Sequence, residues 1–513
     1  MAEQQRFSDV RDWIARFERR SFLEAVARIG AEIVGASGEV QMSDGRTSLM
    51  AHHFLARVAL ISAIYGRDHG TPASRDDVIM ACSKWNQLED PFLEVAEEEA
   101  TIDDVHAILI RMSWDQFPVQ ERPQDNIRIW YGIYRRAREA GVLGPEFDAL
   151  WEQVFSLPLD DWYQSALIYW LLVVAPNLPP EALGLPKGTH GIGVEPSHSI
   201  GELRDRAKRF GDAAAGLEAI VGDLSQTYSE LKERYGLTRP AEELLERYAV
   251  NPLASKPILK RDAAHFVLPV LRLFGNALGL ATLYRLMEDD TNFPAAFGRA
   301  FEHYVGETLM ASFSCVLPED TYRDGRDEWS GFDWTVVERD YALVIECRTS
   351  RIPVGAKTTG DLKAIVDGLK RAVSEPASKM PAKVEHIRKG LTKTPPDILD
   401  RPVHRLIVTV ENMHLDSLYT ELAGYDPKNP DAPILVSVAG LQRLLSVQGK
   451  TIHELIEEYR SGYVANESGS IDQWLRSHET YAALIGQHPI PREDRDLLMP
   501  PRTSEDTEGP KDE

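Results

Sequence analysis

The spacing of apolar residues predicts helices through about the first 250 residues. Apolar positions recur every three or four residues in the segments 11–36, 50–66 and 127–143. This period is typical of helices that bury one face, and the alternation of β-branched residues that marks strands is scarce here. We therefore expect an N-terminal helical domain over residues 1–175.

Changes in composition and in the spacing of apolar residues predict the remaining domain boundaries. A segment rich in glycine and proline follows the helical domain and predicts a loop, and ragged apolar spacing then favours a helical hairpin or connector. The later segments read as an α/β domain, a short C-terminal helix and an acidic, disordered tail. In chain order these are the loop 176–200, the connector 201–250, the α/β domain 251–470, the helix 471–490 and the tail 491–513.

Within the α/β domain, the pattern changes from helical to alternating and back. We expect a helix over 296–313, strands at 314–320, 332–340 and 341–350 with a turn at Arg339–Asp340, a helix over 360–380 and a strand at 404–412. This order predicts a mixed central sheet covered by helices. The fold class is therefore multidomain, with an all-α region followed by an α/β domain.

Composition limits the class of protein and its cellular location. The chain has 513 residues, a net charge of −23 and three cysteines without a CxxC spacing, which argues against a disulfide scaffold, a zinc ribbon or a secreted protein. The N-terminus lacks the apolar core of a signal peptide. The most apolar run, 166–175, is about half as long as a bilayer requires and predicts a buried helix. We expect a cytoplasmic protein without a membrane partner.

The charge is not evenly spread. Residues 348–405 hold thirteen Lys or Arg against six Asp or Glu, whereas the whole chain is acidic and has no general affinity for polyanions. This basic zone predicts one local anion-binding surface. An ordinary set of solvated helix faces explains it equally well.

Two acids interrupt the apolar strands of the α/β domain. Residues two apart share a strand face, so Glu346 and Arg348 project together while Ile345 and Cys347 face the other way. If the two strands form a meander, Asp333 lies on the neighbouring strand close to Glu346. Two such carboxylates repel each other unless a divalent cation binds between them. Mg²⁺, or Mn²⁺ in its place, is the expected ion because it prefers oxygen ligands.

These residues resemble the PD-(D/E)xK phosphodiesterases, the restriction-endonuclease-like superfamily, over about residues 265–415. Asp333 matches the first metal-binding acid, Glu346-Cys347-Arg348 matches the (D/E)xK element, and Glu302 matches an acid that many members carry on the preceding helix. The resemblance implies an α-β-β-β-α-β core. It also implies that Asp333 and Glu346 bind Mg²⁺, that Glu302 assists as a ligand or through water, and that a lysine orients the attacking water.

The chain departs from that motif in two places. Phe332 replaces the proline before Asp333, which matters little because the proline only shapes a turn. Arg348 replaces the lysine, and a guanidinium cannot act as a general base, although it can orient water or stabilise a phosphate. The alternative is an amine from elsewhere in the chain, with Lys363 as the first candidate and Lys357 as the second.

The leading hypothesis is therefore a Mg²⁺-dependent nuclease acting on DNA, by analogy in a bacterial restriction or anti-phage defence protein. In this hypothesis, Arg348 faces the scissile phosphate. The N-terminal helices form a recognition, regulatory or assembly module, which binds a protein partner or forms a homo-oligomer. The residues expected to hold the nucleic-acid backbone are Arg351, Lys357, Lys370 and Arg371.

Two other interpretations stay open. The domain could be a catalytically inactive nuclease fold that binds nucleic acid or a partner protein, which the arginine at 348 and the acidic total favour. It could be a purely structural sheet on a helical scaffold, with Glu346 and Arg348 forming a salt bridge. Metal binding at His52 and His53, or at the group His190, Glu195 and His198, lacks a supporting ligand pattern.

Overall fold

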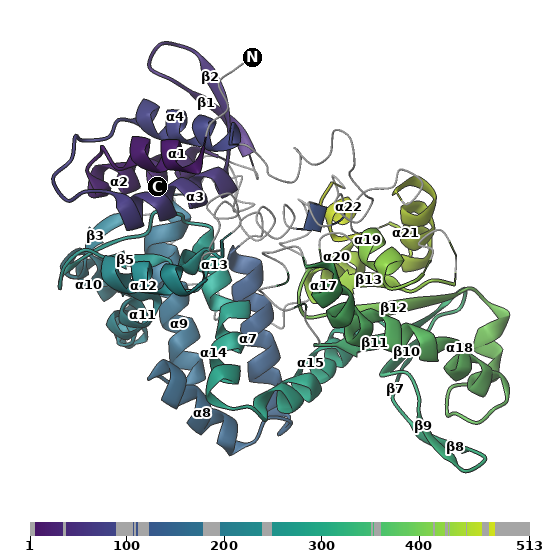
Figure 1. The fold of residues 1–513 in the computed structure, drawn as a ribbon. Helices are drawn as coiled ribbons and strands as arrows, with labels where there is room; N and C mark the ends of the chain where they lie inside the picture. Colours follow the sequence, from purple (N-terminus) through teal and green to yellow (C-terminus); the bar gives the residue numbers. More distant parts are fainter. Residues whose placement is uncertain are drawn as a thin grey trace, which may run out of the picture.

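The structure is a computed structural model that describes most of the chain between residues 6 and 477. Figure 1 shows a helical part, which extends to α13 (Leu273–Leu278) and α14 (Leu280–Asp289), and a sheet flanked by helices, formed by the chain that follows. Helices α7 (Pro123–Glu139) and α15 (Phe293–Met310) pack against each other where the two parts meet. The described residues are 6–33, 37–88, 106, 109–110, 123–177, 195–238, 249–349, 352, 356, 361–413, 416–425, 429, 431–447, 449–463 and 471–477.

The first helices form where the apolar spacing predicts them. They are α1 (Phe7–Ile14), α2 (Arg19–Glu32), α3 (His52–Tyr65) and α4 (Arg75–Asn86). The prediction of an all-α region is nevertheless wrong between α2 and α3, where β1 (Ser37–Gln41) and β2 (Thr47–Ala51) pair as an antiparallel hairpin. The signal was present in the sequence, because Asp44-Gly45 is a typical hairpin turn and Gly45 has a φ of +86°.

The next helices build an aromatic core. They are α7, α8 (Pro145–Phe155), α9 (Leu159–Tyr169) and the π-helix η3 (Trp170–Val174). The apolar run at 166–175 lies in α9, η3 and the start of the 3₁₀-helix η4 (Ala175–Asn177), and its residues from 166 to 174 are almost all buried, as predicted. No helix in the described ranges is both long enough and apolar enough to cross a membrane.

A small second sheet lies beside these helices and was not predicted. Its strand order is β3 (Ser197–Ser199), β6 (His265–Val267), β5 (Ile258–Lys260) and β4 (Ser225–Thr227). Each strand has three residues, too few for an alternating pattern to show in the sequence. The connector region itself contains the short helices α10 (Ile200–Ala207), α11 (Leu217–Leu224) and α12 (Tyr228–Thr238) rather than one long helix.

The five-stranded sheet of the C-terminal part is mixed, as the sequence predicts. Three strands are antiparallel neighbours, and two further strands continue the sheet in parallel. Its order is β13 (Ile434–Ser437), β12 (Val403–Thr409), β11 (Ala342–Arg348), β10 (Trp334–Val337) and β7 (Val316–Pro318). The combination of helical and α/β parts agrees with the predicted fold class.

Helices cover both faces of this sheet. On the face that carries Leu343 and Ile345, the core includes side chains of α15, α20 (Val438–Ser446) and α21 (Ile452–Glu458). On the face that carries Val344, it includes side chains of α17 (Leu362–Leu369), the π-helix η9 (Lys370–Ser374), α18 (Glu375–Arg388) and α19 (Asp416–Leu422). The sheet is thus the middle of three layers.

The hydrophobic clusters join segments that are far apart in the chain. Residues between 127 and 174 share one cluster with α15 and the large sheet. Residues between 7 and 88 pack instead with side chains between 231 and 273. Burial therefore connects residues across the predicted boundary at 175.

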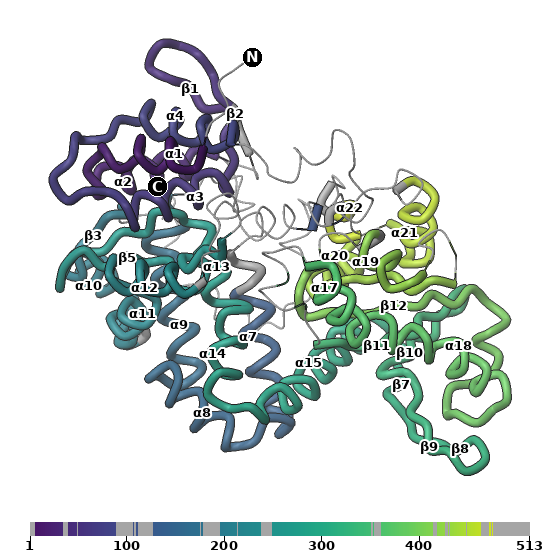
Figure 2. Tube along the Cα trace, in the orientation of Figure 1, coloured from purple at the N-terminus to yellow at the C-terminus, as the bar shows by residue number. Residues whose placement is uncertain are grey.

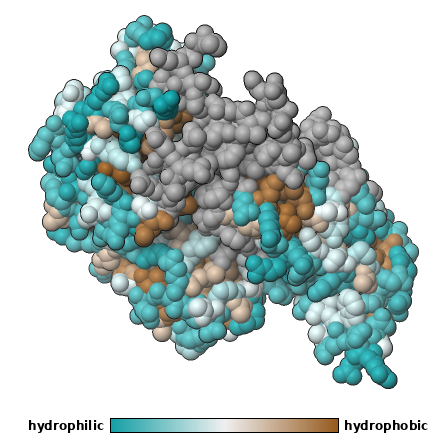
Figure 3. All heavy atoms as spheres, in the orientation of Figure 1, coloured by the Kyte–Doolittle hydropathy of each residue, from teal (hydrophilic) through white to brown (hydrophobic). Residues whose placement is uncertain are grey.

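One hairpin extends beyond the layers. Strands β8 (Thr321–Asp324) and β9 (Asp327–Ser330) pair with each other and project from the sheet (Figure 2). Figure 3 shows that the projecting end of the molecule is hydrophilic, in keeping with the mostly exposed residues of both strands. The base of the hairpin is fixed to α18, because the Tyr322 hydroxyl and the Nδ1 of His386 are 3.0 Å apart.

Close packing of α15 on the sheet depends on a glycine. A Cβ atom at Gly306 would overlap the indole ring of Trp334. That indole in turn donates a hydrogen bond from Nε1 to the carbonyl oxygen of Glu302, at 3.0 Å. The glycine therefore sets the distance between α15 and β10, and with it the position of Glu302.

We predict that Gly306→Ala lowers the free energy of unfolding by about 1–3 kcal/mol, because the steric overlap outweighs the gain in helix propensity. Urea denaturation followed by circular dichroism measures it. Gly298→Ala on the same helix is the matched control, since its nearest side-chain neighbour is 3.8 Å away. Equal effects of the two substitutions would contradict the prediction.

Candidate active site

Strands β10 and β11 place the two predicted acids opposite each other. They pair antiparallel with Trp334 opposite Ile345, and continuing this register by one position sets Asp333 opposite Glu346. Residues directly opposite in such a pair have Cβ atoms about 5 Å apart. The meander expected from the sequence therefore exists, and it brings Asp333 and Glu346 together.

Glu346 is almost completely enclosed, with 1% of its surface exposed. Its Oε1 accepts a bond from the Nζ of Lys383 at 2.5 Å, and its Oε2 accepts one from Arg348 at 2.5 Å. A carboxylate in such a place is stable only when paired and hydrogen-bonded. Both oxygens of Glu346 meet this condition.

Asp333 is held by the same strand from the other side. Its Oδ2 accepts the backbone N–H of Cys347 at 2.6 Å and lies 3.4 Å from the Nη1 of Arg348. Burial, followed by the charge of Glu346, raises the pKa of Asp333 to about 7. Asp333 is therefore partly protonated near neutral pH, and a divalent cation bound beside it would favour its ionised form.

Glu302 stands near this pair without joining it. Burial and the charges of Glu319 and Glu346 raise the pKa of Glu302, while Arg348 lowers it. Its carboxylate does not form a three-ligand group with Asp333 and Glu346 among the described residues. As a result, Asp333 and Glu346 are the acids placed to bind a divalent ion directly. Glu302 is placed to contact such an ion only through a water molecule.

The amine of this site is Lys383, which the sequence analysis did not select. It lies on α18 with 7% of its surface exposed, and its Nζ also donates to the carbonyl oxygen of Gly331 at 2.5 Å. Its ammonium lies 5.3 Å from the ring centre of Phe332, so the residue at the motif's proline position contacts the lysine. The available signal was a lysine on the apolar stripe of α18, next to Met380 and Val384.

The candidates chosen from the sequence lie elsewhere. Lys363 is exposed on α17, and Lys370 and Arg371 are exposed at the start of η9. Arg351 and Lys357 fall outside the described residues. No hydrogen bond or ion pair of the described residues joins Lys363 to Asp333 or Glu346. Cys347 is buried in the core on the opposite sheet face, as expected, and burial raises the pKa of its thiol.

Comparison of the chain with protein-family models, with curated proteins and with solved structures finds no match.

The raised pKa of Asp333 gives a pH prediction for the protein in EDTA. An acid with a raised folded-state pKa adds stability below its unfolded pKa of about 4, and that stability is lost as the pH rises through the folded value. Between pH 6 and pH 8, the wild type should lose about 1 kcal/mol more unfolding free energy than Asp333→Asn. Urea denaturation at both pH values measures this difference. The same pH dependence in both proteins would show that Asp333 is not responsible.

Proposed function

We propose that the C-terminal α/β part is a Mg²⁺-dependent nuclease of the PD-(D/E)xK type that hydrolyses DNA phosphodiester bonds. The observation that carries the proposal is the convergence of two carboxylates, Asp333 and Glu346, with the ammonium of Lys383 on a rigid sheet. Two acids and a lysine are the groups that the sequence resemblance implies. Lys383 supplies the amine that position 348 lacks.

The arrangement of elements supports this assignment. Helix α15 precedes three antiparallel neighbours, β7, β10 and β11, which are followed by the helices α17 and α18 and the parallel strand β12. This is the helix, three strands, helix and strand of the implied core. The hairpin β8–β9 and the strand β13 are additions to it.

Asp333 and Glu346 would hold Mg²⁺ or Mn²⁺, and the ion would supply an activated water and a positive charge against the phosphate. Glu346 keeps its contact with Lys383, whose side chain is 8% exposed, whereas Arg348 is 27% exposed and can move. Arg348 thus leaves the acids and turns to the scissile phosphate, where its guanidinium binds the oxygens.

Lys383 orients the attacking water. An ammonium has three N–H donors, and the described contacts of Lys383 use two of them, on Glu346 and Gly331. The third remains for a water beside Glu346. This is the role that the resemblance implies for a motif lysine, reached here from a helix instead of from the strand.

The exposed cations of α17 and η9 bind the DNA backbone. Lys363 on α17 and Lys370 and Arg371 on η9 are all exposed. Phosphate contacts of this kind position nucleic acid without reading its sequence. With a net charge of −23 on the chain, binding depends on this local zone. The N-terminal helices serve recognition, regulation or assembly, by analogy with restriction or anti-phage defence proteins.

One observation favours a second candidate function, a catalytically inactive nuclease fold that binds nucleic acid or a partner protein. Arg348 lies within 3.4 Å of Asp333 and 2.5 Å of Glu346, so one guanidinium bridges both acids. If that bridge is permanent, the arginine takes the place of the metal ion, and the site contributes only to stability.

The test is cleavage of linear and supercoiled DNA, single-stranded DNA and RNA, with Mg²⁺, Mn²⁺ or EDTA. We expect metal-dependent cleavage of DNA that falls at least about 100-fold in Asp333→Asn and Glu346→Gln. Asp340→Asn is the matched control, an exposed acid at the other end of the same strand pair. Binding of DNA without cleavage in any metal would support the inactive fold instead.

A second prediction concerns the lysine. Lys383→Gln should reduce cleavage at saturating DNA by about 100-fold or more, while Lys363→Gln should change it less than about threefold. Near-ultraviolet circular dichroism verifies that Lys383→Gln folds, and DNA affinity in EDTA should stay within about threefold. If Lys363→Gln abolishes cleavage and folded Lys383→Gln retains it, the assignment of the amine is wrong.

A further inference from the structure

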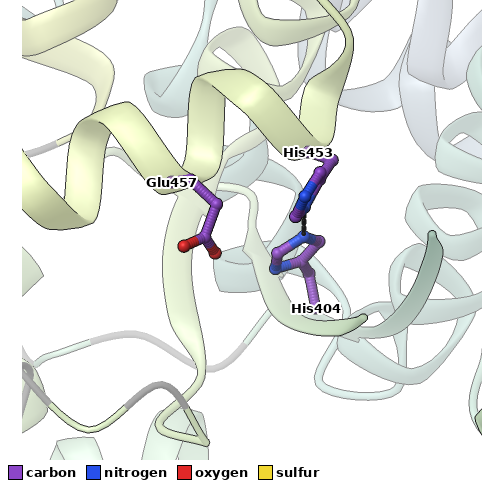
Figure 4. A group of neighbouring side chains, drawn as sticks. All are labelled: His404, His453 and Glu457. Carbon is purple, nitrogen blue, oxygen red and sulfur yellow. Dashed lines mark hydrogen bonds between the residues drawn. The ribbon is translucent and has the colours of Figure 1, made fainter. Parts of the chain in front are cut away.

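A second group of chemically active side chains lies on the other face of the large sheet. His404 is on β12, and His453 and Glu457 are on α21. One ligand atom from each of the three lies within 4.8 Å of the others. Figure 4 shows the carboxylate of Glu457 directed toward the ring of His404, with His453 beside it.

This group is separate from the carboxylate pair. His404 has the same strand parity as Leu406 and Val408, which pack on the face covered by α15 and α20. Glu346 points to the opposite face and pairs in register with Ile407. Three residues of strand, about 10 Å, also separate His404 from Ile407 along β12.

The fold holds the three residues in place. His453 and Glu457 are four residues apart on α21, so they project on the same side of the helix. The helix begins at a capping box, in which Thr451 and Glu454 bond each other's backbone N–H. The ring of Tyr341 packs against both imidazoles, with centroid distances of 6.4 Å to His404 and 6.1 Å to His453.

The imidazole of His404 is not satisfied by the protein alone. His404 is 2% exposed, and the Nδ1 atom of its ring is buried without a hydrogen-bond partner among the described residues. Its Nε2 lies 2.8 Å from the Nδ1 of His453, so the two rings share one proton. An unpaired buried polar atom costs about 1–3 kcal/mol, so the protein keeps this imidazole in the group at a cost in stability.

We propose that His404, His453 and Glu457 bind a divalent transition-metal ion, with Zn²⁺ as the expected ion. Two imidazoles and one carboxylate are typical of zinc sites that keep a fourth position for water. The nitrogens of a tetrahedral zinc site lie about 3.3 Å apart, so replacing the shared proton requires only a small separation of the rings. Mg²⁺ prefers an all-oxygen shell, which distinguishes this site from Asp333 and Glu346.

Charges of both signs lie near the group. The positive charge of Arg460 acts on the ring of His404 and opposes a bound cation. Glu457 supplies a negative charge on the same side. The bound ion would link α21 to the first residues of β12 and thereby fix the C-terminal helices on the sheet.

The experiment uses the full chain carrying Asp333→Asn and Glu346→Gln, which keep the size and the hydrogen-bonding oxygen of each side chain while weakening metal binding by the carboxylate pair. After dialysis against EDTA, Zn²⁺ binding is measured by titration calorimetry and Co²⁺ binding by visible absorption. We expect one site whose Co²⁺ spectrum is that of a four- or five-coordinate ion with nitrogen ligands. Zn²⁺ should also raise the melting temperature.

Glu457→Gln and His453→Gln should each weaken Zn²⁺ binding at least about tenfold. Glu457 is exposed, so its variant should fold normally. His265→Gln is the matched control, because this exposed histidine lies outside the group and contacts Asp262. Unchanged Zn²⁺ affinity in both Glu457→Gln and His453→Gln, or a Co²⁺ spectrum typical of water alone, would overturn the proposal.

Discussion

The enclosed carboxylate of Glu346 is the constraint on which the C-terminal part depends. Removing a carboxylate from water costs several kcal/mol unless cations and hydrogen bonds compensate. Lys383 and Arg348 provide that compensation at 2.5 Å each. Because Lys383 belongs to α18, the same interaction fixes this helix on the sheet, and its bond to the Gly331 carbonyl fixes the chain that leads into β10. The contacts that stabilise α18 on the sheet are therefore the same contacts that form the candidate active site.

The balance of charge around Glu346 gives the site two stable arrangements in principle. Arg348 bridges both acids in this structure, and Asp333 still has a raised pKa because burial and Glu346 outweigh the arginine. A divalent ion would satisfy both acids and release Arg348 for a phosphate. Arginine and metal therefore compete for one pair of carboxylates. If the metal binds, the group can act as an active site; if the arginine stays, the group is a structural salt bridge.

The two faces of the sheet carry different chemistry because strand residues alternate. Oxygen ligands, Asp333 and Glu346, meet under α18, whereas nitrogen ligands from His404 and His453 meet on the face covered by α15, α20 and α21. Hard ions prefer the first set and borderline ions the second. Under the two proposals, the two faces of this sheet would bind different metal ions.

The sequence by itself determined the helices of the N-terminal part, the mixed sheet and the acids Asp333 and Glu346, because periodicity and strand alternation are local properties. It missed the small sheet of β3, β4, β5 and β6 and the β1–β2 hairpin, whose patterns are short. Only the tertiary structure decided that Lys383, rather than Lys363, reaches Glu346. Helix α18 crosses the sheet at that point, and a lysine on its inner face is buried only when a carboxylate lies below it. The pairing of His404 with His453 has the same origin, since their contact depends on how α21 packs on β12.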